Sequence, residues 1–133
     1  ARRGLGAPGA LTVEEWMPRR PRSGGSVALT TAQLPAGQHR RELLRLVRSQ
    51  LVTIVSGETG SGKTTCIPQQ MMDDRSLVPP DKMVVVTQPR RIAAVSIAQH
   101  VAAQRGEAVG GTIGYHIRFD NRTSGHTRLV YCT

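Results

Sequence analysis

Aromatic residues, cysteines and long hydrophobic runs are scarce in this sequence. These shortages argue against nucleic-acid binding mainly by base stacking, against a cysteine metal site and against a membrane span. Only 3% of the 133 residues are Phe, Trp or Tyr, so stacking of bases on aromatic rings cannot be the main way of contacting a nucleic acid. The two cysteines, Cys66 and Cys132, lack metal-ligand spacing, and we expect structural thiols in an intracellular protein. No apolar run reaches the roughly 18 residues of a membrane span, and no secretory signal is recognisable. The sequence does not indicate which cellular compartment contains the protein.

The charge of the chain is strongly positive. Eighteen basic residues against nine acidic ones give a net charge of +9 at pH 7. All the basic residues except Lys63 and Lys82 are arginine. The planar arginine side chain suits phosphate, so this composition favours a polyanionic partner such as a nucleic acid. The alternative is that these charges simply lie on a solvated surface.

The order of the predicted elements indicates an α/β fold. Residues 1–30 are rich in Gly, Pro and Arg and are expected to form a flexible basic arm. From residue 31 to 133 the hydrophobic pattern alternates between strand and helix, which predicts a parallel sheet with helices on both faces. The predicted helices are 38–49, about 62–72 and 90–105, and the predicted strands are 51–56, 82–87, 111–119 and 127–132.

Some side chains carry more specific expectations. In the helix 90–105, the spacing of apolar residues points Ile92, Val95, Ala98 and Val101 or Ala102 inward, and Gly106 is the expected stop. Alternation along 111–119 predicts that Tyr115 and Phe119 are core residues. Pro68 lies inside the helix 62–72, where a proline costs about 3 kcal/mol. Residues 120–126 are expected to form a polar turn.

Eight residues of the sequence form a phosphate-binding pattern. Gly57 to Thr64 read G-x-x-x-x-G-K-T, between a predicted strand and a predicted helix, which is the context that this motif requires. Glycine allows the tight turn that directs successive N–H groups at an anion. Lys63 supplies a mobile charge for the β- and γ-phosphates, and the Thr64 hydroxyl suits Mg²⁺. A chance match is the alternative.

Three further motifs follow the loop in a fixed order. These are TQPRR at 87–91, IGYHIRFD at 113–120 and TRLVYCT at 127–133. Together with the loop, they resemble the first RecA-like domain of DEAH-box RNA helicases, and the resemblance covers residues 34–133. It implies a truncated P-loop NTPase fold that uses ATP and Mg²⁺.

The resemblance also implies roles for individual residues. The nucleotide would be held by Gly57, Thr59, Gly60, Ser61, Gly62, Lys63, Thr64 and Thr65, with Lys63 and Thr64 catalytic and Thr64 on the metal. His100 stands where many family members have an arginine that stacks on adenine. Single-stranded RNA would be bound through its backbone by Arg90, Arg91, Arg118 and Thr133.

The implied activity is ATP hydrolysis coupled to movement on single-stranded RNA, or to remodelling of ribonucleoproteins. Protein cofactors or a ribonucleoprotein complex are expected partners, and a membrane is not. The sequence contains no D-E-A-H motif, so we expect this segment alone to be inactive. Two alternatives remain: a catalytically weak RNA-binding scaffold with a helicase fold, and a nucleotide kinase, which would leave TQPRR and IRFD without a purpose.

Overall fold

The computed structural model describes residues 32–133, so the basic arm predicted for residues 1–30 lies outside the described residues. The chain divides into two compact units between Lys63 and Thr64, and each is described by itself. Among residues 32–133, no helix combines the length and the apolar composition needed to cross a membrane.

The described part of the first unit, residues 32–63, contains two short helices. The first, α2 (Pro35–Gln38), begins with proline, whose fixed φ suits a first helical position. The second, α3 (Arg40–Ser49), buries Leu43, Leu44 and Leu46 along one side. The helix predicted for residues 38–49 is therefore confirmed, with its start shifted by two residues.

The strand predicted for residues 51–56 is wrong. These residues form neither helix nor strand, and the side chains of Leu51, Val52 and Ile54 are 102%, 74% and 79% exposed. A strand needs a partner for its backbone N–H and C=O groups, and no strand within residues 32–133 pairs with this segment. The hydrophobic composition of these residues is typical of a strand, but composition does not show whether a neighbouring strand is present to pair with them.

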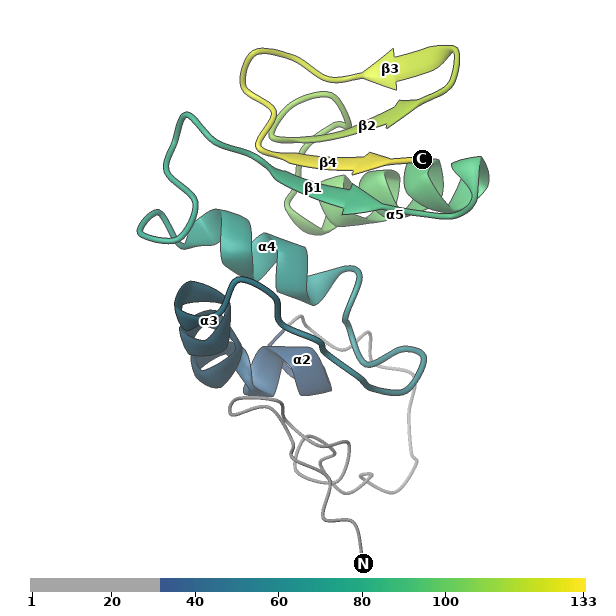
Figure 1. Cartoon of the computed structure of the whole chain (residues 1–133). Coiled ribbons are helices and arrows are strands. Elements are labelled where there is room, and N and C mark those ends of the chain that lie inside the picture. Colours follow the sequence, from purple (N-terminus) through teal and green to yellow (C-terminus); the bar gives the residue numbers. More distant parts are fainter. Residues whose placement is uncertain (1–31) are drawn as a thin grey trace, which may run out of the picture. The chain divides into compact units, whose positions relative to one another are not determined.

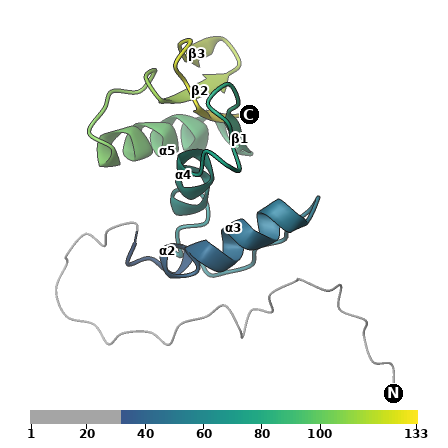
Figure 2. The ribbon, with the colours of Figure 1, turned by 90° about the vertical axis from the view of Figure 1, so that its left-hand side faces the viewer.

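The second unit is a sheet with two helices (Figures 1 and 2). The helix α4 (Cys66–Asp73) precedes β1 (Val84–Thr87), and α5 (Arg91–Gln104) connects β1 to β2 (Ile113–Ile117). Two further strands complete the sheet, β3 (Asp120–Arg122) and β4 (Leu129–Cys132). The strand order is β1-β4-β2-β3, with β4 parallel to both of its neighbours and β3 antiparallel to β2.

The three parallel strands were predicted, and β3 was missed. It lies inside residues 120–126, which were expected to form only a turn. All three of its residues are exposed and polar or charged, so no hydrophobic alternation marked it. Backbone pairing with β2 makes it a strand.

The core of this unit lies on one face of the sheet. Register partners bring Val84, Ile113 and Leu129 side by side, and the next pair on the same face is Tyr115 and Tyr131. Met72 of α4 and Ala94, Ala98, Val101 and Ala102 of α5 join these residues in a single buried cluster. The α/β class and the parallel pairing are confirmed, and a second helical layer stays a prediction.

Two expectations about helices α4 and α5 are wrong. Ile92 is 84% exposed, and Ala94, fully buried, takes the inward position instead. Helix α4 starts at Cys66 rather than near Gly62, so Pro68 is its third residue. The N–H groups of a first helical turn have no partner within the helix, and the expected cost of Pro68 therefore disappears. The predicted end of α5 is confirmed, since Gly106 follows it with a φ of 70°.

We predict that Gly114→Ala destabilises the second unit. An added Cβ would lie 2.4 Å from the backbone oxygen of Arg122, and the backbone of the β2–β3 hairpin cannot move away as a flexible side chain could. The unfolding free energy, measured by denaturant titration, should fall by about 1–3 kcal/mol. Gly125→Ala is the matched control, because its Cβ meets nothing within 4 Å. An equal effect of the two substitutions would contradict this account.

Candidate functional site

The first part of the phosphate-binding motif forms a tight loop in the first unit. Gly60 and Gly62 have φ values of 83° and 92°, a backbone conformation that favours glycine. The Lys63 ammonium donates hydrogen bonds to the carbonyl oxygens of Gly57 and Glu58. The loop therefore curves around the lysine side chain; its expected binding of phosphate stays a prediction.

Ser61 has a larger part in this loop than its variable position in the motif indicates. It is 6% exposed, and its hydroxyl lies 3.1 Å from the Lys63 ammonium, which donates to it. Its carbonyl oxygen accepts a hydrogen bond from the N–H of Ala36, at 3.0 Å. Ser61 thus orients Lys63 and joins the loop to α2. No motif position signals this role.

The second part of the motif enters α4 in the second unit. The carbonyl oxygen of Thr64 accepts a hydrogen bond of 2.9 Å from the hydroxyl of Tyr131, and burial raises the pKa of that hydroxyl. The carbonyl oxygen of Thr65 accepts one of 2.8 Å from Nε2 of Gln69. Side chains from β4 and α4 therefore hold the two threonines that the motif assigns to the nucleotide. Sequence reasoning missed both Gln69 and Tyr131.

Residues 32–133 offer little else to a metal ion. They contain no group of three or more His, Cys, Asp or Glu side chains that could hold one. The Thr64 hydroxyl is the hard oxygen ligand that the motif provides. This fits Mg²⁺, which commonly takes few protein ligands and completes its shell with substrate phosphates and water.

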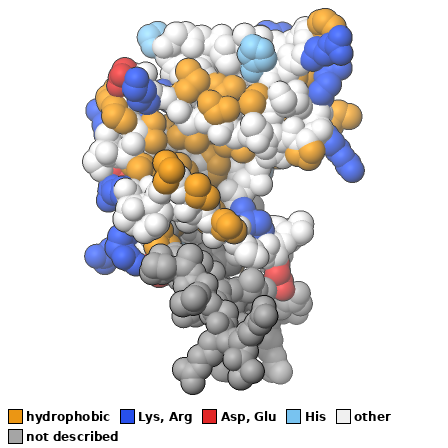
Figure 3. Space-filling model, in the orientation of Figure 1, with side chains coloured by type: hydrophobic (Ala, Val, Ile, Leu, Met, Phe, Trp, Pro, Cys, Tyr) orange, Lys and Arg blue, Asp and Glu red, His pale blue; other side chains and the backbone are white. Residues whose placement is uncertain are grey.

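The four expected RNA-binding residues all follow parallel strands. Arg90 and Arg91 come shortly after β1, Arg118 directly after β2, and Thr133 directly after β4. Because β4 is parallel to β1 and β2, these strands end at the same edge of the sheet, where open α/β folds bind ligands. Basic side chains gather at the side of the second unit where β1 ends and α5 begins (Figure 3).

Backbone hydrogen bonds hold this edge together. The N–H of Gln88 donates to the carbonyl oxygen of Cys132 at 2.7 Å, and that of Thr133 donates to the carbonyl oxygen of His116 at 3.4 Å. The exits of β1, β2 and β4 are therefore linked just before the expected RNA-binding residues. Sequence separation alone could not show this.

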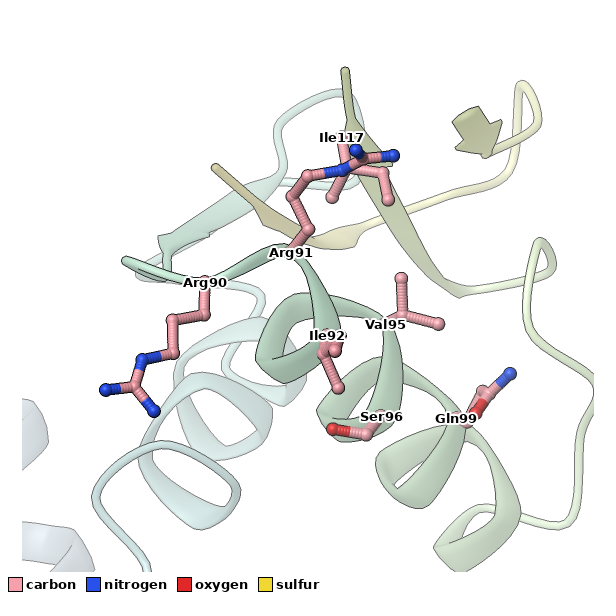
Figure 4. A pocket seen from close by; sticks show the side chains of 7 residues that line it. All are labelled: Arg90, Arg91, Ile92, Val95, Ser96, Gln99 and Ile117. Carbon is pink, nitrogen blue, oxygen red and sulfur yellow. The ribbon is translucent and has the colours of Figure 1, made fainter. Parts of the chain in front are cut away.

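An open groove lies where α5 begins. Arg91 extends toward Ile117 of β2, whereas Arg90 extends in another direction (Figure 4). Aliphatic side chains and two arginines line it, so it combines apolar surface with positive charge. The lining residues are Arg90, Arg91, Ile92, Val95, Ser96, Gln99 and Ile117.

Arg118 belongs to a strained turn beside this groove. Its guanidinium lies 4.7 Å from the centre of the Phe119 ring, a distance typical of a cation–π contact. Phe119 was predicted to be a core residue, which is wrong, because it is 86% exposed. The alternation of β2 ends at Ile117, and Phe119 lies in the turn with a φ of 69°. A bulky residue rarely adopts this conformation, and such strain clusters at functional sites.

His100 is not near the start of α5. It is exposed, and its Nε2 lies 3.0 Å from Nε2 of Gln104, one helical turn further along. Gln104 in turn accepts a hydrogen bond from Gln69 of α4, at 3.2 Å. The expected contact of His100 with adenine stays a prediction.

Comparison with known proteins gives several related helicases, although no protein-family model matches the chain. DHX57 of Homo sapiens is 47% identical over 110 residues, which is 81% of this chain and 8% of that protein. DExH1 of Arabidopsis thaliana is 45% identical over 76% of this chain and 10% of its own length. DHR2 of Saccharomyces cerevisiae is 45% identical over 75% of this chain and 14% of its own length. All three names describe ATP-dependent RNA helicases.

Over the matched part, this chain belongs to the DEAH-box RNA helicase family. The chain spans about a tenth of the length of these relatives. Family membership implies a RecA-like fold, and the parallel strands and helices of the second unit agree with it. The resemblance carried by the four sequence motifs is confirmed.

We predict that Tyr131→Phe lowers stability in a pH-dependent way. Removing the hydrogen bond to Thr64 should cost about 1 kcal/mol of unfolding free energy at neutral pH. Because the folded pKa of Tyr131 is raised above its ordinary value of 10.0, the tyrosine contributes fully below pH 10 and loses its contribution as the pH rises further. Denaturant titrations at pH 7 to 11 should therefore show the two proteins converging above pH 10. A difference that grows with pH would contradict this assignment.

Proposed function

We propose that this protein is an ATP-dependent RNA helicase of the DEAH-box type, which couples ATP hydrolysis to movement on single-stranded RNA. One observation carries the proposal: the chain has a phosphate-binding loop and also a basic edge formed by the ends of three parallel strands. The basic edge is not required for binding a nucleotide alone, so it favours a second, polyanionic partner.

The nucleotide side of the proposal rests on Lys63 and the residues after it. Its ammonium is held by the carbonyl oxygens of Gly57 and Glu58 and by Ser61, in a glycine-rich loop of the kind that binds anionic phosphate. Thr64 and Thr65 follow immediately and lead into α4, so the positive end of a helix adds to the attraction. These residues bind and orient the β- and γ-phosphates of ATP.

Mg²⁺ is the metal that this loop suits. It supplies neutralisation of the charge that develops on the phosphates. Thr64 would hold it through its hydroxyl, while Lys63 binds the phosphates directly. Tyr131 and Gln69 fix the backbone of Thr64 and Thr65, which keeps both hydroxyls in place.

The RNA side of the proposal rests on the arginines at the carboxyl edge of the sheet. Arg90, Arg91 and Arg118 present guanidinium groups, which pair with phosphate oxygens in two-pronged fashion. Phosphate contacts position a strand without reading its sequence, as a motor that moves along RNA requires. We propose that these contacts strengthen and weaken as the nucleotide changes, and that protein cofactors or a ribonucleoprotein complex direct the motor to its substrate.

The nucleotide role predicts that Lys63→Ala abolishes turnover. In the full-length protein, RNA-stimulated ATP hydrolysis should fall by about a hundredfold or more, because the phosphates lose a positioned charge in the transition state. Lys82→Ala is the matched control, since Lys82 is the other lysine of the sequence and pairs with Asp81 on the surface. If RNA-stimulated ATP hydrolysis survives in Lys63→Ala, the proposed ATP-driven motor function is refuted. If the wild-type protein binds RNA without hydrolysing ATP, the alternative of a catalytically weak RNA-binding scaffold is supported instead.

The RNA role predicts a selective loss in the double variant Arg90→Ala/Arg91→Ala. RNA affinity should fall similarly for all sequences, and the dependence of log affinity on log salt should flatten by about one unit per lost phosphate contact. ATP affinity without RNA should persist, because the loop is untouched. The matched control is Arg40→Ala/Arg41→Ala, an adjacent exposed pair at the start of α3. Loss of ATP binding with intact RNA binding would show that the assignment is wrong.

A further inference from the structure

Two carbonyl oxygens at the start of α4 are bound by buried side chains. Thr64 accepts a hydrogen bond from the Tyr131 hydroxyl, and Thr65 accepts one from the Gln69 amide, at 2.9 and 2.8 Å. Tyr131 is fully buried, and Gln69 is 7% exposed. These hydrogen bonds fix the peptide groups of the two residues whose hydroxyls serve the nucleotide under the proposed function.

The Gln69 side chain also reaches α5, the helix that begins with Arg91. Its Nε2 donates to Oε1 of Gln104 at 3.2 Å, and its Oε1 accepts from Arg105 at 3.4 Å. The same amide therefore contacts α4 through Thr65 and the last turn of α5 through Gln104. Arg91 and Gln104 are the first and last residues of the same helix, so a shift of the whole helix on RNA binding would move both.

The Tyr131 side chain makes an equivalent connection through β4. It lies two residues before Thr133, whose N–H is bound to the carbonyl oxygen of His116. The neighbouring Cys132 accepts a hydrogen bond from Gln88, which stands two residues before Arg90. A change at the ends of β1 and β4 is thereby carried to the Tyr131 hydroxyl and on to Thr64.

We propose that Gln69 and Tyr131 are positioning residues that couple RNA binding to the nucleotide loop. This inference rests on the proposed function. Both are uncharged and buried, and a hydrogen bond is electrostatically stronger inside a protein than in water; of their partners, Gln104 is exposed. Each joins one nucleotide residue to one element that carries RNA-binding residues: Gln69 joins Thr65 to α5, and Tyr131 joins Thr64 to β4.

A purely structural role predicts something different. If these side chains only stabilise the fold, their removal lowers the melting temperature and leaves communication between ligands unchanged. Coupling between two ligands is reciprocal, and it is measured as the ratio of RNA affinities with and without bound nucleotide. That ratio separates the two roles, because a change that weakens both states equally does not alter it.

The test compares Gln69→Met and Tyr131→Phe in the full-length protein with two matched controls. Both substitutions keep the size of the side chain and remove its hydrogen bonds. Gln70→Met alters the next glutamine of α4, which contacts Cys66 of its own helix. Tyr115→Phe alters the register partner of Tyr131, whose hydroxyl donates to Asp120 instead of to the loop.

RNA dissociation constants would be measured with and without a saturating non-hydrolysable ATP analogue, together with the KM for ATP with and without RNA. We expect Gln69→Met and Tyr131→Phe each to reduce the coupling ratio by about threefold or more. Both controls should keep the wild-type ratio. Tyr131→Phe removes a single oxygen atom, so it serves alone if Gln69→Met does not fold.

A wild-type coupling ratio in folded Gln69→Met and Tyr131→Phe would overturn the inference and leave the helicase proposal intact. So would an equal loss of coupling in the Gln70→Met and Tyr115→Phe controls, because the effect would then not depend on the contacts to Thr64 and Thr65. A wild-type protein whose ATP hydrolysis does not respond to RNA would overturn the proposed function, and this inference with it.

Discussion

The parallel pairing of β4 with β1 and β2 is the constraint on which the candidate RNA site depends. Parallel strands end at the same edge of a sheet, so residues that follow three separate strands become neighbours. Arg90, Arg118 and Thr133 are far apart in the sequence, and each follows a strand that ends at this edge. The register is held by the buried face, because a slip of one residue would turn Tyr131 and Leu129 away from the core.

In the second unit, the packed core of the sheet supports a turn with an irregular backbone conformation. The core is built of close-packed aliphatic side chains and two tyrosines, whereas Phe119 adopts a left-handed backbone conformation at the groove. In the first unit, Gly60 and Gly62 adopt such a conformation in the phosphate-binding loop. Strain of this kind persists only where the surrounding structure maintains it. Among these residues only Phe119 is strained, because glycine adopts a positive φ freely, as Gly106 and Gly110 also do away from the segments proposed to contact ligands.

Prediction from the sequence succeeded where local pattern and long-range packing agree. The strands containing Val84, Ile113 and Leu129 are apolar and lie in a buried sheet, and α5 ends at a glycine as expected. Prediction failed where the structure depended on the presence of a neighbouring strand or on the residue at which a strand ends. The residues 51–56 are apolar but lack a neighbouring strand among the described residues, and Phe119 follows the last residue of β2, where alternation no longer applies.

The sequence by itself determined which chemical groups this protein has: a glycine-rich loop with one lysine, a threonine that the motif predicts as a metal ligand, and arginines after apolar strands. Short motifs carry this information because each group must lie at a set distance along the backbone from its neighbours. Only the tertiary structure decided that Ser61 orients Lys63, that Gln69 bridges α4 and α5, and that Tyr131 binds the carbonyl of Thr64. The contacts of Gln69 with Gln104 and of Tyr131 with Thr64 join partners that are 35 and 67 positions apart, and no local pattern encodes them.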